Sequence, residues 1–225
     1  MFQEKKVIAI IPARKGSKRL PKKNTKLFLG RPLITYTLKQ ALSSKYLDEI
    51  YVTTNDPEII EISQKYRVKI IQRPEELATD FAKMQTVLEH VLQNIPTEPD
   101  FIVLLQPTNP LRKTETIDKA IKTFIENSGR YDSLMPLKKI RLKKGKIIKD
   151  YYVPENKTEI RGQDLEKEYQ ECGTIFIYKS FLVKNKILNN EKIMPFLIED
   201  YFEAIDIDNL EDFYIAESIK RRFKN

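Results

Sequence analysis

The chain has 225 residues, with 40 Lys or Arg against 32 Asp or Glu, and its formal net charge is +8. A single cysteine, Cys172, and a single histidine, His90, exclude an internal disulfide and any metal site built from several cysteines or histidines. No apolar run approaches the length of a membrane span, and the N-terminal residues lack the apolar segment of a signal peptide. We therefore expect a cytoplasmic protein that does not associate with a membrane.

Strand and helix patterns alternate along most of the chain. Short apolar runs typical of buried strands occur at 7–11, 49–53, 68–71, 101–105, 133–137 and 174–178. Apolar residues at helical spacing occur at 32–44, 57–62, 81–92, 117–125 and 210–222, and Asp56-Pro57 has the composition of a helix start. This alternation predicts an α/β protein with a mainly parallel, Rossmann-like sheet and helices on both of its faces. We expect a single domain over residues 1–225.

The first strand pattern ends in a loop that is rich in positive charge, residues 12–24. Its Lys and Arg side chains offer charge and N–H donors to an anion, and Gly16 lets the backbone approach a ligand closely. Open α/β sheets bind ligands beyond the carboxyl ends of their strands, so this basic loop predicts a phosphate site. The spacing matches neither a Walker A motif nor a GxGxxG dinucleotide motif, and a solvated surface loop is the alternative interpretation.

A second basic stretch, residues 138–149, alternates Lys with apolar residues. The alternation predicts a two-stranded hairpin that turns near Lys144-Gly145. The segment 138–172 interrupts the alternation of strands and helices, and we expect it to leave the main sheet as a small excursion. The positive net charge also raises the alternative of an RNA-binding protein, although the chain has no aromatic signature of the RNP type.

Two acidic residues near the C-terminus, Asp206 and Asp208, alternate with Ile205 and Ile207. In an extended segment, residues two apart point the same way, so the two carboxylates are expected to share one face. A pair of carboxylates suits Mg²⁺, which prefers oxygen ligands and substrate phosphates. Asp208 with Glu211 also has the pattern of a helix cap, and the two roles are compatible.

Segments spread in order over nearly the whole chain resemble the CMP-sialic acid synthetases, also called acylneuraminate cytidylyltransferases. The matching residues are Ala13, Arg14, Ser17, Lys18, Leu20, Pro21, Lys23 and Asn24, then Arg73-Pro74, Glu76-Leu77-Ala78 and Asp80, then Leu104-Leu105-Gln106-Pro107-Thr108 and Pro110-Leu111-Arg112, then Arg161, Gln163-Asp164-Leu165, Tyr169 and Gly173, and finally Asp206-Ile207-Asp208 with Asp212. The resemblance implies that residues 1–225 form one nucleotidyltransferase domain, with residues 138–172 serving dimerisation and the acceptor site.

The resemblance also implies a set of residues for the nucleotide and for catalysis. The nucleotide would be bound by Arg14, Ser17, Lys18, Lys23, Asn24 and Arg73. The catalytic residues would be Arg14, Lys23, Asp206 and Asp208, and the two aspartates would also hold Mg²⁺. For Arg73 the alternative is an ordinary surface residue. Lys83 and Met84 stand where the family has small hydroxyl residues, so those contacts to the base are not carried over.

By the same resemblance, the sugar acid would be bound by Gln106, Arg161 and Tyr169, with Arg161 pairing with its carboxylate. Cys172 stands where the family has Asn, and Glu166 where it has Pro, so the acceptor pocket is expected to differ. Thr108 and Asn109 are interpreted as turn-forming residues. Cys172 is not expected to act as a nucleophile, because the one histidine lies on a predicted helix elsewhere.

Together these features predict a cytidylyltransferase that transfers CMP from CTP to a nine-carbon, sialic-acid-like sugar acid and releases pyrophosphate. The resemblance implies a homodimer in which residues near 138–170 reach the partner's site. One alternative is the activation of another sugar acid, such as KDO, pseudaminic acid or legionaminic acid. The other is a non-enzymatic RNA-binding protein, which leaves the Asp206 and Asp208 pair unexplained.

Overall fold

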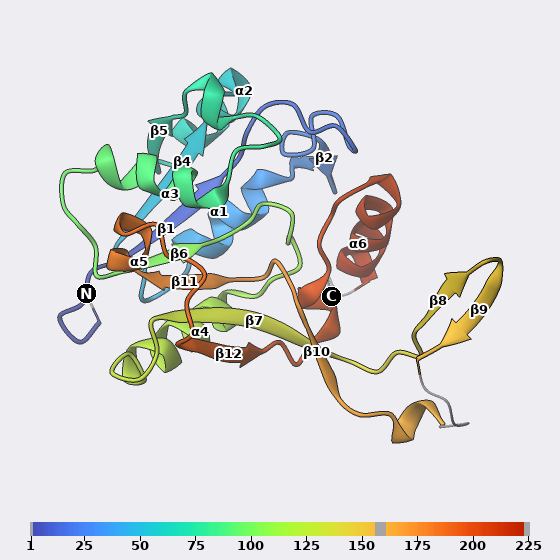
Figure 1. Cartoon of the computed structure of the whole chain (residues 1–225). Helices are drawn as coiled ribbons and strands as arrows, with labels where there is room; N and C mark the ends of the chain where they lie inside the picture. The colour runs from blue at the N-terminus through green and yellow to red at the C-terminus, as the bar shows by residue number, and fades with distance from the viewer. Residues whose placement is uncertain (1, 156–160, 223–225) are drawn as a thin grey trace.

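The fold is built on one central sheet (Figure 1), seen in a computed structural model that describes residues 2–155 and 161–222. In the described residues this sheet has eight strands in the order β10-β7-β11-β6-β1-β4-β5, with β12 paired to β7. The strands are β1 (Val7–Pro12), β4 (Glu49–Thr54), β5 (Lys69–Gln72), β6 (Phe101–Leu104), β7 (Ser133–Ile140), β10 (Glu168–Glu171), β11 (Phe176–Lys179) and β12 (Ile193–Leu197). Only β10 and β11 run against their neighbours, so the sheet is mainly parallel, as predicted.

Helices cover both faces of the sheet (Figure 1). One face carries α1 (Ile34–Leu42), α2 (Pro57–Lys65) and α4 (Thr114–Glu126), and the other carries α3 (Met84–Gln93) and α5 (Ser180–Lys184). Alternate residues of β1 join the two cores, with Val7, Ala9 and Ile11 on the first face and Ile8 and Ile10 on the second. A strand buried on both faces has no need for polar residues, which explains the uninterrupted apolar run in the sequence.

The helix starts agree with the sequence at one site and differ at another. The side chain of Asp56 accepts a hydrogen bond from the N–H of Glu58 at 3.0 Å, so the predicted cap of α2 is confirmed. The stretch predicted as a helix from Phe81 begins only at Met84, and Phe81 is 91% exposed. The intervening residues form turns after the short 3₁₀ helix η1 (Glu75–Leu77). No helix of the described segments has the length and apolarity to cross a membrane.

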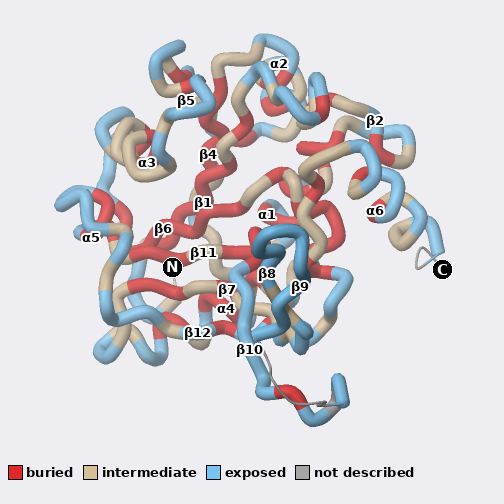
Figure 2. Tube along the Cα trace, turned by 45° about the vertical axis from the view of Figure 1, so that its right-hand side comes forward, coloured by how far each residue is buried: buried red, intermediate tan, exposed pale blue. Residues whose placement is uncertain are grey.

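The excursion from the sheet is narrower than predicted. β7 continues through Ile140, and β10 pairs with it from Glu168, so the chain leaves the sheet only between these residues. The hairpin is formed by β8 (Gly145–Ile148) and β9 (Tyr151–Pro154), and it projects from the body (Figure 1) and is exposed (Figure 2).

The hairpin turn lies at Lys149-Asp150, so the predicted turn at Lys144-Gly145 is wrong. Ile148 pairs with Tyr151, which leaves two turn residues, and both have positive φ, 46° and 66°. Two such residues match the twist of antiparallel strands. Gly145 instead begins β8, where a side chain would collide with the ring of Tyr152 at 2.5 Å.

A third apolar cluster lies outside the two cores and joins segments that are distant in the sequence. It contains Leu20 of the basic loop, Phe28 of β2 (Leu27–Phe28), Leu33 after β3 (Arg31–Pro32), Leu111, Ile207, and Phe213 and Ala216 of α6 (Leu210–Arg222). Burial of these side chains brings together the loops that follow β1 and β6 and the segment that precedes α6. The polar residues of these three segments are therefore held near one another.

Candidate active site

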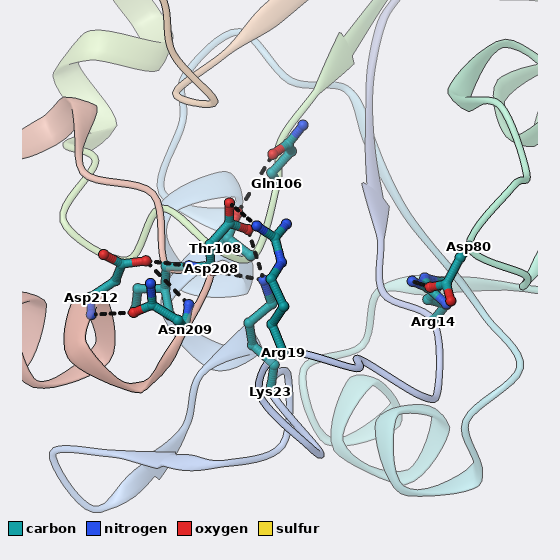
Figure 3. A network of polar contacts seen from close by, with 10 residues as sticks. Arg14, Arg19, Lys23, Asp80, Gln106, Thr108, Asp208, Asn209 and Asp212 are labelled. Atoms are coloured by element: carbon teal, nitrogen blue, oxygen red, sulfur yellow. Dashed lines mark hydrogen bonds and ion pairs between the residues drawn. The ribbon is translucent and has the colours of Figure 1, made fainter. Parts of the chain in front are cut away.

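One half of the basic loop is held by a carboxylate from another segment. Arg14 donates to the carbonyl of Ala78 at 3.1 Å and pairs with Asp80 (Figure 3). Lys18 Nζ lies 2.6 Å from the second oxygen of Asp80. Hydrogen bonds from Lys18 and Arg14 lower the pKa of Asp80, so this carboxylate stays ionised between the two cations. The sequence analysis gave Asp80 no role.

The other half of the loop meets the segment of the two aspartates (Figure 3). Lys23 Nζ donates to the carbonyl of Ile207 at 2.7 Å and lies 3.5 Å from Asp208 Oδ1. Arg19 Nη1 lies 3.1 Å from Asp208 Oδ2. Burial lowers the pKa of Lys23, and the carboxylates of Asp208 and Asp206 oppose that effect. The structure thus brings together Lys23, Asp206 and Asp208, although Lys23 and Ile207 are 184 residues apart.

The loop after β6 holds the same acidic segment from its other side. The Asn109 side chain donates to the carbonyl of Ile205 at 2.9 Å, and the N–H of Ile207 donates to the carbonyl of Thr108 at 2.9 Å. These bonds flank Asp206 on both sides. Asn109 does take part in a turn, as its backbone bonds to Gln106 and Arg112 show, but its buried side chain also fixes the acidic segment.

The helix cap at the start of α6 differs from the predicted pair of Asp208 and Glu211. The side chain of Asn209 accepts from the N–H of Asp212 at 2.8 Å, and Asp212 Oδ2 accepts from the N–H of Asn209 at 3.1 Å. Asp212 Oδ2 also accepts from the N–H of Asp208 at 2.9 Å. This reciprocal arrangement is a capping box shifted by one residue, and it leaves the carboxylate of Asp208 free to face Lys23.

A pocket of about 470 Å³ opens beside Asp206. Its wall includes Gln106 from the end of β6, Lys138 from β7, and Cys172 with Gly173 between β10 and β11. Burial raises the pKa of the Cys172 thiol, and its sulfur lies 3.4 Å from Thr174 Oγ1, which agrees with a structural role for this residue. The pocket is suited to a polar ligand because amide, ammonium and carboxylate groups line it together.

A second cavity, of about 320 Å³, lies along the basic loop. Arg14, Ser17, Lys23 and Asn24 line it, together with the start of α2. Four of the predicted nucleotide-binding residues therefore border one cavity, and Lys23 links that cavity to the acidic segment. The excess of cations over carboxylates in its wall favours an anionic ligand.

Arg73 and Asn24 make contacts within the protein. Arg73 is only 4% exposed, which rules out the alternative of an ordinary surface residue, and its guanidinium donates to the carbonyl of Thr53 at 2.8 Å. Burial, and then the neighbouring charge of Arg14, lower the pKa of Arg73 to about 10. The Asn24 side chain donates to the carbonyl of Arg14 at 3.4 Å. Asn24 therefore supports the backbone at Arg14, whereas Arg73 bonds to Thr53, whose carbonyl also accepts from the N–H of Ala13.

Arg161 and Tyr169 do not line the pocket beside Asp206 within their own chain. Arg161 pairs with Asp164 at 2.6 Å on the projecting segment, next to the short helix η2 (Gly162–Asp164). Tyr169 belongs to β10, where it pairs with Lys139 of β7, and it is 50% exposed. Of the three residues predicted to bind the acceptor, only Gln106 is in that pocket.

Arg112 is a positioning residue that the sequence analysis did not single out. Its fully buried guanidinium donates to the carbonyls of Thr174 at 2.5 Å and Gln106 at 3.0 Å, and to Thr37 Oγ1 at 2.9 Å. Burial lowers its pKa to about 9, so it remains charged at neutral pH. The motif that contains Arg112 was visible in the sequence, but two of its acceptors, Thr174 and Thr37, lie 62 and 75 residues away.

The acidic segment suits a hard divalent cation that takes some of its oxygen ligands from the protein and the others from a substrate. The described residues contain no group of three or more His, Cys, Asp or Glu side chains that could hold a metal ion. Mg²⁺, however, is commonly held by one or two carboxylates and substrate phosphates. Asp206 Oδ1 is buried and has no hydrogen-bond partner in the described part of the protein. An orphaned anionic oxygen of this kind is suited to a cation.

Comparison with known proteins bears on what this arrangement is for. A family model described as cytidylyltransferase matches residues 8–220 of the chain. The chain is a member of the cytidylyltransferase family. The resemblance found in the motifs is thereby confirmed, and with it the assignment as a nucleotidyltransferase.

Three relatives of this cytidylyltransferase are named for legionaminic acid, acylneuraminate and pseudaminic acid. CMP-N,N'-diacetyllegionaminic acid synthase of Legionella pneumophila is 32% identical, over 95% of this chain and 96% of the relative. N-acylneuraminate cytidylyltransferase of Escherichia coli is also 32% identical, and the match spans 96% of this chain but 52% of that longer protein. Pseudaminic acid cytidylyltransferase of Campylobacter jejuni is 29% identical, over 94% of this chain and 95% of the relative.

Solved structures agree with the fold. CMP:2-keto-3-deoxy-manno-octonic acid synthetase, solved in complex with CTP, superposes with a TM-score of 0.73 over 96% of this chain and 99% of the other, at 17% identity. A cytidylyltransferase from Leptospira borgpetersenii gives a TM-score of 0.68 at 21% identity, over 98% of this chain and 88% of the other. At these identities the likeness confirms the α/β, Rossmann-like fold.

Proposed function

We propose that this cytidylyltransferase transfers CMP from CTP to the anomeric hydroxyl of a nonulosonic acid. The observation that supports this most strongly is the contact of Lys23 with Ile207 and Asp208. It joins the cavity of the basic loop, suited to a triphosphate, to the pocket that Gln106 and Asp206 line. A nucleotide and a polar acceptor bound in these two places meet at the acidic segment.

The reaction is a substitution at the α-phosphorus of CTP. The anomeric oxygen forms a bond to that phosphorus, the bond to the bridging oxygen breaks, and pyrophosphate departs while the hydroxyl proton is lost. Arg14, Lys18 and Lys23 hold the triphosphate and neutralise the charge that develops on the leaving pyrophosphate. Ser17 and Asn24 border the same cavity, and Asn24 donates to the carbonyl of Arg14, which supports the backbone there.

Asp206 and Asp208 would hold Mg²⁺ together with the phosphates of CTP. When bound, this cation supplies positive charge at the reacting phosphate and favours ionisation of an adjacent hydroxyl. The unpartnered oxygen of Asp206 supports this assignment, as does the position of Asp208 between Arg19 and Lys23. Because these cations contact Asp208, a phosphate held by them lies next to the carboxylate.

We further propose that the protein acts as a homodimer. Ile147, Ile148, Tyr151 and Tyr152 of the hairpin are between 52% and 79% exposed, and the hairpin projects away from the body (Figure 1). Arg161 lies on the same projecting segment, away from the acceptor pocket of its own chain. A partner copy that covers the hairpin would place Arg161 and Tyr169 at the neighbouring acceptor site.

The homodimer has a simple test in solution. Sedimentation velocity on the full chain should give twice the mass of one chain, 26.5 kDa. Replacing Ile147 and Tyr152 together by Lys should convert the dimer to monomers, because charge replaces the apolar contact. The single-chain mass for the parent protein at micromolar concentration, with full turnover, would contradict the proposal.

The proposed function is tested by a panel of acceptors with CTP and Mg²⁺, scored by pyrophosphate release. We expect turnover with at least one of N-acetylneuraminic, legionaminic and pseudaminic acids, and none when ATP or GTP replaces CTP. Turnover with the eight-carbon acid KDO alone would instead favour the alternative acceptor. Because Cys172 stands where the family has Asn and Glu166 where it has Pro, we expect the panel to show whether the preferred acceptor differs from N-acetylneuraminic acid. No turnover with any acid, together with RNA binding that weakens steeply with salt, would replace the proposal by the RNA-binding alternative.

A further inference from the structure

The backbone at Gly173 passes unusually close to three polar side chains. A Cβ atom at this position would lie 2.7 Å from Asn109 Oδ1, 3.0 Å from Gln106 Oε1 and 3.1 Å from Asp206 Oδ2. Gly173 does not have the positive φ that would favour glycine for conformational reasons. The space in front of its Cα, and not its backbone conformation, therefore requires the absence of a side chain.

Two of the three neighbours, Asn109 and Asp206, have little freedom to move away. Asn109 is fully buried, and its amide nitrogen is committed to the carbonyl of Ile205. The segment around Asp206 is fixed by the backbone bond between Ile207 and Thr108. An atom added at Gly173 would therefore displace the side chains that form the site, because the surrounding backbone is held in place.

Two of the polar side chains around Gly173 each have a buried oxygen that lacks a hydrogen-bond partner among the described residues. Asn109 Oδ1 and Asp206 Oδ1 are both buried without a hydrogen-bond partner in the segments that the structure describes. A buried polar atom without a partner lowers the stability of the folded protein. Unsatisfied oxygens gathered at one place indicate that the arrangement is kept for binding or catalysis.

We propose that Gly173 is a positioning residue for the acceptor side of the site. Its missing side chain lets Gln106 from the loop after β6 and Asp206 from the acidic segment approach each other across the wall of the same pocket. Asn109 limits how far Asp206 can move, because its side chain donates to the carbonyl of the preceding residue, Ile205. This inference rests on the proposed function, since it takes the pocket to be the place where the sugar acid binds.

The test is the Gly173→Ala variant, with Gly129→Ala as a matched control. Gly129 has no neighbouring atom within 4 Å of an added Cβ and no positive φ, so its substitution should leave kcat and both KM values unchanged. For Gly173→Ala we expect the KM for the sugar acid to rise about tenfold or more and kcat to fall. The Kd for CTP, titrated without the sugar acid, should stay within about twofold, because Gly173 is not among the residues that line the cavity of the basic loop.

A double-mutant cycle with Asn109→Ser separates crowding from general loss of stability. Ser is shorter and removes the nearest contact, so the Gly173→Ala penalty on the KM of the sugar acid should be smaller in the Asn109→Ser background. If Gly173→Ala alone does not fold, the double variant should fold. Equal penalties in the two backgrounds, or a Gly173→Ala protein with the parent's KM, would overturn the inference.

The outcome also distinguishes this inference from the proposed function. If the unmodified protein turns over a sugar acid and the Gly173→Ala variant matches it, only the role of Gly173 fails. If the unmodified protein releases no pyrophosphate with any acid of the panel, the proposed function fails, and the role assigned to Gly173 fails with it.

Discussion

Replacing Asp206 by Asn is expected to lower kcat by about 100-fold or more while the Kd for CTP changes by about threefold or less. Asn keeps the size of the side chain and one of its oxygens but removes the negative charge. Asp206 lines the acceptor pocket, and among the described residues one of its oxygens is buried without a hydrogen-bond partner, so its charge is available to a bound cation. The cations that we assign to the triphosphate remain intact in this variant.

The measurement is steady-state pyrophosphate release as a function of Mg²⁺ concentration, paired with a CTP titration. The Asp206→Asn variant should need much more Mg²⁺ for its residual turnover. Asp118→Asn is a suitable control, because Asp118 is a carboxylate of α4 that binds Ser44 and Lys45 and lines neither cavity of the site. Parent-like turnover of Asp206→Asn at limiting Mg²⁺ would show that Asp206 does not hold the metal.

Replacing Arg112 by Met is expected to lower the free energy of unfolding by about 3–5 kcal/mol. The guanidinium is completely buried and donates to Thr174, Gln106 and Thr37. Met fills much of the volume but removes the donor to the carbonyl of Thr174 and to Thr37 Oγ1, and each buried group that loses its partner is costly. The carbonyl of Gln106 keeps the N–H of Asn109 and the hydroxyl of Thr37 as donors but loses the guanidinium, so the KM for the sugar acid should rise in the folded fraction.

Urea denaturation at neutral pH measures this effect. Arg112→Lys keeps the charge but has one ammonium in place of the planar fork, so we expect it to recover only part of the loss. Arg130→Met serves as the control, because Arg130 is exposed and its described contact is the ring of Tyr131 at 5.1 Å, an interaction that contributes about 1 kcal/mol or less. An Arg112→Met loss no larger than that of the control would contradict the role assigned to Arg112.

Local patterns were sufficient for six of the eight strands described in the sheet and for the two loops at the centre of the site, but they missed β10 and β12. Val7 to Ile11 and Phe101 to Leu104 are uninterrupted apolar runs, and both became strands buried on both faces. The local patterns gave the wrong position where two nearby residue pairs were both suitable for the same turn or cap. Lys144-Gly145 resembles a turn, yet the pairing of Ile148 with Tyr151 places the turn five residues later.

The cap of α6 shows the same limit. Asp208 and Asn209 are both good caps, and the spacing to Glu211 or Asp212 suits either choice. The third apolar cluster, which buries Ile207 and Phe213, sets the register, and it selects Asn209 with Asp212. This choice matters for the site because it leaves Asp208 available to Lys23 and Arg19.

The sequence alone determined the fold class, the family and the types of residue at the site, because these depend on periodicity and on motifs within short segments. It could not determine which partner each charged group would meet. The pairing of Arg14 and Lys18 with Asp80, the burial of Arg112 and the crowding at Gly173 all join segments that only chain folding brings together. Such contacts are set by how helices and strands pack in three dimensions, and no local pattern records them.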